Sequence, residues 1–345
     1  MNAFDRWLAS EAVGDQISLV RLTGSYQNAA ATVLQELEIY LSGVLTSSDR
    51  PITEWRRQYT TDMLASVRSR ISQVYTDLTD IADLPHVASS VSKKLVKDLR
   101  LVFNDAEAPS GAMLRALVDD TLIRGAPSGE WWSQQDQKVM FQFTNLVRMG
   151  QASGMTNGQM KRDLSAMMDI SRREADALVR SSVMAVANEA REATLKNNQD
   201  VLRGMRFLAT LDNRTTITCM GYAGSEWDFD GKPLNDLARA LAGGYKKPPL
   251  HWGCRSTLVP LTKELKGIPA FEPPTRASMD GPVKGNLTFA AWLEAKPKAF
   301  QEDMLGVTKS RLWREGKLTL QQLLDFRGDP LTLEQLQERW GVVID

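Results

Sequence analysis

Residues 55–81, WRRQYTTDMLASVRSRISQVYTDLTDI, carry the clearest structural signal in the sequence. From Trp55 to Ile81, apolar residues recur at steps of three and four, with charged residues between them. This is the period of a helix that buries one face and exposes the other. Pro51, just before the stretch, suits a first helical turn, where the missing amide hydrogen has no partner to lose. The stretch therefore predicts a long amphipathic helix that begins just after Pro51.

The distribution of proline extends this prediction outward. Four of the 14 prolines precede residue 200, and the other ten lie from Pro233 onward. Because proline interrupts helices, long helices are expected before residue 200 and shorter elements after it. Capping-box spacing, with Ser or Thr three residues before Gln or Glu, predicts helix starts at Thr156 and Ser171. The further helices expected in this part are a short one at 34–41 and weaker ones at 88–104 and 112–123.

The character of the sequence changes near residue 203. Residues 205–211 are rich in strand formers, Asp212 begins a turn, and 215–218 resemble a second strand. We expect a helix at 234–242, a stiff loop at 246–255 followed by a short strand, and helices at 288–304, 308–325 and 332–339; no internal repeat is evident.

The predicted fold class is therefore α+β and predominantly α-helical, with a small mixed module after the long helices. The predicted segments are a helical N-terminal region at 1–125, a second helical part at 126–202, the α+β module at 203–265, a proline-rich arm at 266–287 and C-terminal helices at 288–345.

Composition excludes several classes of protein. Lys plus Arg and Asp plus Glu both number 42, so the net charge is zero and bulk charge would not hold the chain to nucleic acid. No run of 18 apolar residues is present, so no transmembrane helix is expected, and the N-terminus does not resemble a signal peptide. Two cysteines and two histidines are too few for a disulfide framework or a self-contained zinc module.

One group of residues in the mixed module could carry chemistry. Cys219, His251 and Cys254 supply three zinc ligands, while a tetrahedral site needs a fourth and position 222 is tyrosine. The simpler interpretation is that both thiols are small buried hydrophobes, and zinc remains an alternative. The full candidate set is Asp212, Arg214, Thr215, Cys219, Tyr222, His251, Cys254 and Arg255.

Catalytic interpretations of the same region are weaker. Cys254 and His251 are close enough in sequence for a nucleophile and base, but no known catalytic motif surrounds them. A metal-dependent nuclease is the other enzymatic alternative, built on Asp212, Glu226, Asp228, Asp230 and His251. Since no catalytic motif is found, we expect a protein that is not an enzyme.

Residues 241–320 hold 13 basic and 7 acidic side chains, with aromatic residues among them. Such a stretch could contact DNA or an acidic protein surface, although an ordinary solvated face is the preferred interpretation. The candidate nucleic-acid or partner contacts are Lys246, Lys247, Lys296, Lys298, Arg311 and Arg314.

The order of these motifs resembles a known family. The pattern D-x-R-T from Asp212, then Cys219, a spacer and P-P-L-H-W-G-C-R ending at Arg255, is similar to the signature of phage head morphogenesis proteins, the Mu protein F-like minor head proteins. The resemblance covers about 130–340 and leaves 1–125 outside it. Its C-terminal part includes Trp292-Leu, Phe300-Gln, Leu305-Gly, Arg311-Leu and the run from Gly316 to Leu320.

The resemblance implies a minor capsid protein of a tailed bacteriophage, which is a structural component of the virion. It implies that the protein lies at or near the portal and acts in head morphogenesis and DNA ejection. It implies the virion head as location, with the host cytoplasm during assembly. The implied partners are the portal protein, major capsid or scaffold proteins, sister copies and packaged DNA, with no membrane.

Similar proteins carry C-x-x-C and C-R-C where this chain has Tyr222 and Ser256, so the implied metal knuckle is incomplete here and no cofactor is expected. The alternative functions are a DNA-binding protein ejected with the genome and a metal-dependent nucleic-acid-processing enzyme using residues 212–255.

Overall fold

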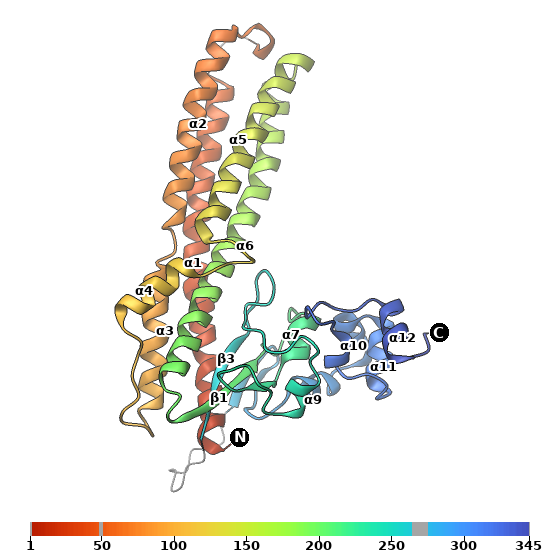
Figure 1. The fold of residues 1–345 in the computed structure, drawn as a ribbon. Helices are drawn as coiled ribbons and strands as arrows, with labels where there is room; N and C mark the ends of the chain where they lie inside the picture. Colours follow the sequence, from red (N-terminus) through yellow and green to blue (C-terminus); the bar gives the residue numbers. More distant parts are fainter. Residues whose placement is uncertain (1, 48–50, 264–274, 345) are drawn as a thin grey trace. The chain divides into compact units, whose positions relative to one another are not determined.

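The computed structural model describes residues 2–47, 51–263 and 275–344. It is 62% helical and 9% strand, with long N-terminal helices, small antiparallel sheets in the middle and short helices at the C-terminal end (Figure 1), which confirms the predicted fold class.

The helices before residue 200 are long, as the scarcity of proline predicts. They are α1 (Ala3–Leu45), η1 (Ile52–Glu54), α2 (Arg57–Thr79), α3 (Leu84–Leu99), α4 (Gly111–Asp120), α5 (Ser128–Ser153) and α6 (Asn157–Asn197). The later elements are shorter: β1 (Leu202–Leu208), α7 (Ile217–Tyr222), β2 (Glu226–Trp227), α8 (Asp236–Arg239), β3 (Thr257–Thr262), β4 (Thr275–Ser278), β5 (Gly281–Lys284), α9 (Phe289–Glu294), α10 (Lys298–Leu305), α11 (Val307–Arg314), η2 (Gln321–Leu323) and α12 (Leu333–Trp340).

The chain forms two compact units, each built from segments that are distant in sequence. One unit combines Val20–His86 with Val118–Val183, and the other combines Met1–Leu19, Val87–Leu117 and Met184–Asp345. The division is interleaved because α1 and α6 are long enough to contribute residues to both units. We call the first the helical unit and the second the mixed unit.

In the helical unit, α2 packs against α5 through the apolar face predicted from residues 55–81. Met63, Val67, Ile71, Val74 and Leu78 are all buried, as the period requires. The helix begins at Arg57 instead of directly after Pro51, because 52–54 form a single 3-10 turn.

Two helix starts predicted from capping boxes have different outcomes. Thr156 and Gln159 exchange backbone–side-chain hydrogen bonds of 2.8 and 3.2 Å, and α6 begins beside them. The start predicted at Ser171 is wrong, because Ser171 lies within α6 and its hydroxyl donates to the Met167 carbonyl one turn earlier. A Ser-x-x-Glu pattern inside a helix satisfies the hydroxyl in this way without ending the helix. The short helix expected at 34–41 is likewise part of the much longer α1.

The mixed unit contains a three-stranded antiparallel sheet with the order β2-β1-β3. The N-terminal end of α1 is fixed to this sheet, since Asp5 accepts hydrogen bonds from the Thr262 amide and hydroxyl at 2.9 and 2.7 Å. Phe4 and Leu8 of α1 join Met205 and Leu258 of the sheet in one buried cluster. Segments about 257 residues apart in sequence therefore share a core.

Residues 266–274 of the segment expected to be a proline-rich arm lie outside the described residues. The part that follows forms a hairpin, in which β4 pairs with β5 and Thr275 lies opposite Lys284. The expected helices at 288–304 and 308–325 are each divided. Pro297 separates α9 from α10, and residues 315–320 separate α11 from η2.

A repeated turn was not anticipated from the sequence. D-F-D-G-K-P from Asp228 and D-F-R-G-D-P from Asp325 fold alike, and in each the first Asp Oδ1 accepts the amides two and four residues later at 2.8–3.0 Å. Gly231 and Gly328 adopt φ values of 79° and 80°, which explains the glycine at that position. Each turn leads into a capped helix, α8 after Asn235 and α12 after Thr332.

Candidate functional site

The candidate residues meet where the turn at 211–215, α7 and the loop before β3 come together in the mixed unit. The Arg255 guanidinium contacts both carboxylate oxygens of Asp212, with an Nη2–Oδ1 distance of 2.9 Å and a second bond from Nη1 to Oδ2. Both side chains are almost fully buried. This bidentate pair joins the loop to the turn.

Asp212 also organises its own turn. Its Oδ1 accepts the Arg214 amide at 3.0 Å and the Thr215 hydroxyl at 3.2 Å. Burial raises the pKa of the Asp212 carboxyl, but the hydrogen bonds and positive charges of Arg255 and Arg214 outweigh it and hold that pKa below its ordinary value. Arg214 itself is exposed, so it contributes a backbone amide and a nearby charge without a buried side chain.

Cys219 is carried by a helix where the sequence predicts a strand. Thr216 caps α7, with its hydroxyl accepting the Cys219 amide at 3.4 Å. The expected strand at 215–218 is therefore wrong. A Thr placed before a short apolar segment can cap a helix, and this local effect outweighs the strand propensity of consecutive threonines.

The two cysteines and His251 form one cluster, although they come from α7 and the loop. Cys219 Sγ lies 3.2 Å from His251 Nε2 and 3.6 Å from Cys254 Sγ. All three candidate ligand atoms lie within 4.8 Å of one another. The Nδ1–H of His251 donates to the Trp252 carbonyl at 2.9 Å, because a carbonyl can only accept. Nε2 of a neutral His251 therefore presents its lone pair to the sulfur atoms.

This donor set fits zinc in type and spacing. Two thiolates bound tetrahedrally at about 2.3 Å lie about 3.8 Å apart, close to the separation of the two sulfur atoms. Hydrogen bonding of the second ring nitrogen to a carbonyl is also typical of a histidine ligand. Within the described parts of the chain, no fourth His, Cys, Asp or Glu joins the group.

The pKa values of the two thiols are shifted in opposite directions within the cluster. The hydrogen bond to Cys254 and burial raise the pKa of Cys219 well above its ordinary value. The hydrogen bond from Cys219, together with His251, lowers the pKa of Cys254 despite its burial. Burial alone would lower the pKa of His251, but Cys254 raises it.

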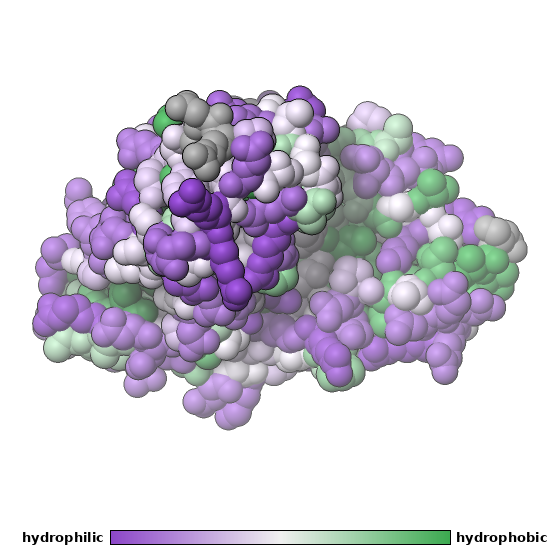
Figure 2. All heavy atoms as spheres, turned by 90° about the horizontal axis from the view of Figure 1, so that it is seen from above, coloured by the Kyte–Doolittle hydropathy of each residue, from purple (hydrophilic) through white to green (hydrophobic). Residues whose placement is uncertain are grey.

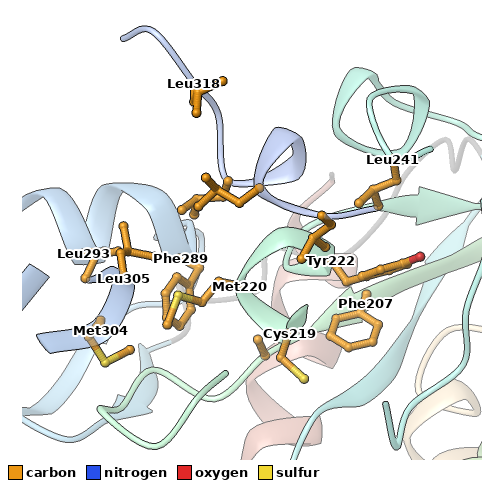
Figure 3. Packing of buried hydrophobic residues seen from close by; sticks show 14 of the residues in the cluster. Phe207, Cys219, Met220, Tyr222, Leu241, Phe289, Leu293, Met304, Leu305 and Leu318 are labelled. Atoms are coloured by element: carbon orange, nitrogen blue, oxygen red, sulfur yellow. The ribbon is translucent and has the colours of Figure 1, made fainter. Parts of the chain in front are cut away.

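The surroundings of the cluster are those of a core. Figure 3 shows Cys219 on α7 beside Phe207 of β1 and Tyr222 of α7, whose rings lie 5.7 Å apart. Both sulfur atoms belong to a buried apolar cluster that also includes residues of α9, α10 and α11. Tyr222 donates its hydroxyl hydrogen to the Gly244 carbonyl at 3.1 Å.

The residues considered for a nuclease are held apart by separate interactions. Glu226 pairs with Arg206 at 3.4 Å, Asp228 closes its own turn, and Asp230 is exposed. Asp212 is committed to Arg255. The described residues therefore do not bring these carboxylates into one metal-binding group.

Most of the predicted contact residues have acidic partners. Lys247 pairs with Glu189 and Glu192 at 2.5 and 2.9 Å, and Lys296 pairs with Asp280. Lys298 and Arg314 both pair with Glu302. Lys246 donates to the Arg327 carbonyl, and Arg311 is partly buried.

Two hydroxyls beside the cluster were missed. Ser256 and Thr216 both hydrogen-bond to Cys219. The Thr-x-x-Cys spacing of a helix cap was the available signal for Thr216. Ser256 has no local signal, because its backbone is placed by Asn188 of α6, whose side-chain amide donates to the Ser256 carbonyl at 3.2 Å.

Comparison with known proteins bears on this site directly. Residues 142–259 match the family model of Phage Mu protein F like protein. The chain carries a Mu protein F-like domain. The matched residues include the Asp212–Arg255 pair and the Cys219–His251–Cys254 cluster.

The Mu protein F-like domain ends within β3, so the hairpin and the C-terminal helices lie beyond the matched residues. No curated protein and no solved structure matches the chain significantly. Among the described residues, no helix is long and apolar enough to cross a membrane.

Proposed function

We propose that this protein is a minor head protein of a tailed phage that docks at or near the portal during head assembly. The observation that carries the proposal is the Mu protein F-like domain over residues 142–259. The domain's most distinctive residues build a core instead of an open site, since both thiols are buried and the Asp212 carboxylate is committed to Arg255. The proposed function is therefore structural and not enzymatic.

Within this proposal, the Cys219–His251–Cys254 cluster connects α7 to the loop before β3, because Cys219 of α7 contacts both loop residues. Zinc bound there would be held by the two sulfur atoms and His251 Nε2 and would strengthen that connection. The Asp212–Arg255 pair would join the same loop to the preceding turn.

The docking surface would lie on the helical unit. Figure 2 shows a largely hydrophilic face with smaller hydrophobic patches between the hydrophilic residues. Large apolar side chains are nevertheless exposed on the long helices, with Phe141 and Met149 of α5 66% and 59% exposed. Such side chains are enriched at protein interfaces and suit a contact with the portal or with sister copies.

Quantitative mass spectrometry of purified particles tests the proposal, with the portal as internal standard. We expect the protein at a fixed ratio to the portal, and its retention after triggered DNA release would support structural docking. Loss on release would make it an ejected protein, and absence from particles would contradict the proposal.

A pair of surface variants locates the contact. Phe141→Arg with Met149→Lys should lower incorporation, because both side chains are exposed on α5 and would present charge to an apolar interface. Val307→Arg is the matched control, since Val307 is equally exposed, at 67%, but lies on α11. Equal incorporation of both variants would exclude the α5 surface as the docking site.

A further inference from the structure

A second polar group in the mixed unit has no role in the Mu protein F-like site. Arg206 of β1 and Arg276 of β4 line a small cavity of about 30 Å³, together with Ala9 and residues 207–209, 223–224 and 285–289, which include the polar Asn286 and Thr288. A cavity of this volume holds about two water molecules. It is therefore large enough for a small ion and too small for a nucleotide or a peptide.

Arg276 is buried, and none of the carboxylates that the structure describes compensates its charge. It is only 8% exposed, Nη2 donates to the Ala209 carbonyl at 2.7 Å, and Nη1 donates to the Leu287 carbonyl at 3.3 Å. Its Nε is buried and makes no hydrogen bond to any described residue. A buried donor that lacks an acceptor is costly, so this Nε–H requires an explanation.

The carboxylates near Arg276 in the described residues interact with other arginines and do not neutralise its positive charge. Glu226 pairs with Arg203 at 3.5 Å and with Arg206 at 3.4 Å, and Asp5 also attracts Arg206. Three arginines therefore face two carboxylates, and no carboxylate of the described residues acts on Arg276. Burial and the repulsion of Arg206 lower the pKa of Arg276 to about 10, so its guanidinium still carries a full charge at neutral pH.

We propose that the Arg206–Arg276 cavity binds one small anion, a carboxylate or an inorganic anion taken from solution, that accepts the free Nε–H of Arg276. The Nε side of a guanidinium presents two parallel N–H groups, which suit the two oxygens of a carboxylate or phosphate. The anion would neutralise the excess positive charge. It would also link β4 to β1, because its two arginines belong to these strands.

Thermal unfolding with different anions at constant ionic strength tests the site. The probes are acetate, chloride and phosphate, each replacing gluconate, which is too large for the cavity. Binding to the folded protein alone multiplies the ratio of folded to unfolded protein by about 100 when the anion is at 100 times its Kd. We expect a saturating rise in Tm for the wild type, and an unchanged Tm with all three anions would overturn the proposal.

Variants separate binding from general charge effects. Arg276→Met should abolish the anion-dependent rise, and Arg276→Lys should weaken it because lysine lacks the paired donors. Arg203→Met is the matched control, since it removes a charge from the same cluster on β1 without lining the cavity, and it should keep the rise. An equal rise in Arg276→Met and the wild type would mean a nonspecific salt effect.

If Arg276→Met does not fold, calorimetric titration of the wild type and of Arg276→Lys with acetate replaces the unfolding measurement. Saturable binding at one site that is weaker in the lysine variant is expected. Equal affinity of the wild type and Arg276→Lys for acetate would overturn the proposal, because the paired donors of the guanidinium would then play no part in binding.

Discussion

Arg255 and Arg276 are two buried arginines of the mixed unit, and their positive charges have different kinds of partner. Arg255 makes a bidentate bond to the Asp212 carboxylate, whereas Arg276 has two carbonyl partners and an unsatisfied Nε. A carboxylate neutralises a guanidinium, but a carbonyl offers only a dipole. Arg255 therefore belongs to a closed structural pair within the Mu protein F-like domain, whereas Arg276 has no negatively charged partner among the described residues.

The largest expected effect comes from opening the closed pair. Asp212→Ala leaves the Arg255 charge buried without a partner, and it should lower the free energy of unfolding by about 3–5 kcal/mol. Urea unfolding followed by circular dichroism measures this. Asp236→Ala is the control, because its pair with Arg239 is exposed and should contribute nothing measurable. A loss as small as that of the control would mean that the buried pair is unimportant.

Removing both charges should restore part of that loss. In the double variant Asp212→Ala with Arg255→Met, no unpaired charge remains in the core, so we expect a total loss of about 1–2 kcal/mol, smaller than for Asp212→Ala alone. The double-mutant cycle isolates the coupling. Additive losses would show that the two side chains act independently.

The thiol–imidazole cluster should contribute less than the ion pair. Cys254→Ala and His251→Ala each remove a partner of the Cys219 sulfur, and each should cost about 1–2 kcal/mol. His86→Ala, which changes the chain's other histidine on the exposed side of α3, should cost little. A folded, equally stable Cys254→Ala protein would contradict a structural role.

Zinc should act through the same three residues. Adding one equivalent of Zn²⁺ to the reduced wild-type protein should raise Tm, and a chelator should reverse the rise, because the metal binds the folded state. Cys254→Ala should abolish it, while His86→Ala should not. A wild-type Tm that is insensitive to zinc would leave a hydrogen-bonded cluster without metal.

The smallest effect is a pH dependence. The folded-state pKa of Asp212 lies below its ordinary value of 3.8, so its contribution to stability is complete above about pH 4 and is lost as pH falls through the folded pKa. Arg276 stays charged throughout this range and should add nothing to it. The difference in unfolding free energy between wild type and Asp212→Ala should therefore shrink below pH 4, and a constant difference would refute the assignment.

The sequence predicted the features that depend on neighbouring residues. The apolar period from Trp55 to Ile81 identified the buried face of α2, and the cap at Thr156 located the start of α6. The predictions of a helix start at Ser171 and of a strand at 215–218 were wrong. Such short patterns can satisfy their hydrogen bonds in more than one backbone conformation. The repeated D-F-x-G-x-P turn could have been found by comparing the sequence with itself.

The candidate site divides in the same way. Spacing and residue type alone were enough to nominate Cys219, His251 and Cys254, and the motif order alone led to the family that the domain match supports. Only the tertiary structure decided that Arg255 pairs with a carboxylate while the partners of Arg276 in the described parts of the chain are carbonyls, since these partners lie 43 and 67 residues away. Compensation of a buried charge depends on which distant groups the fold brings within hydrogen-bonding distance, and no local pattern encodes that.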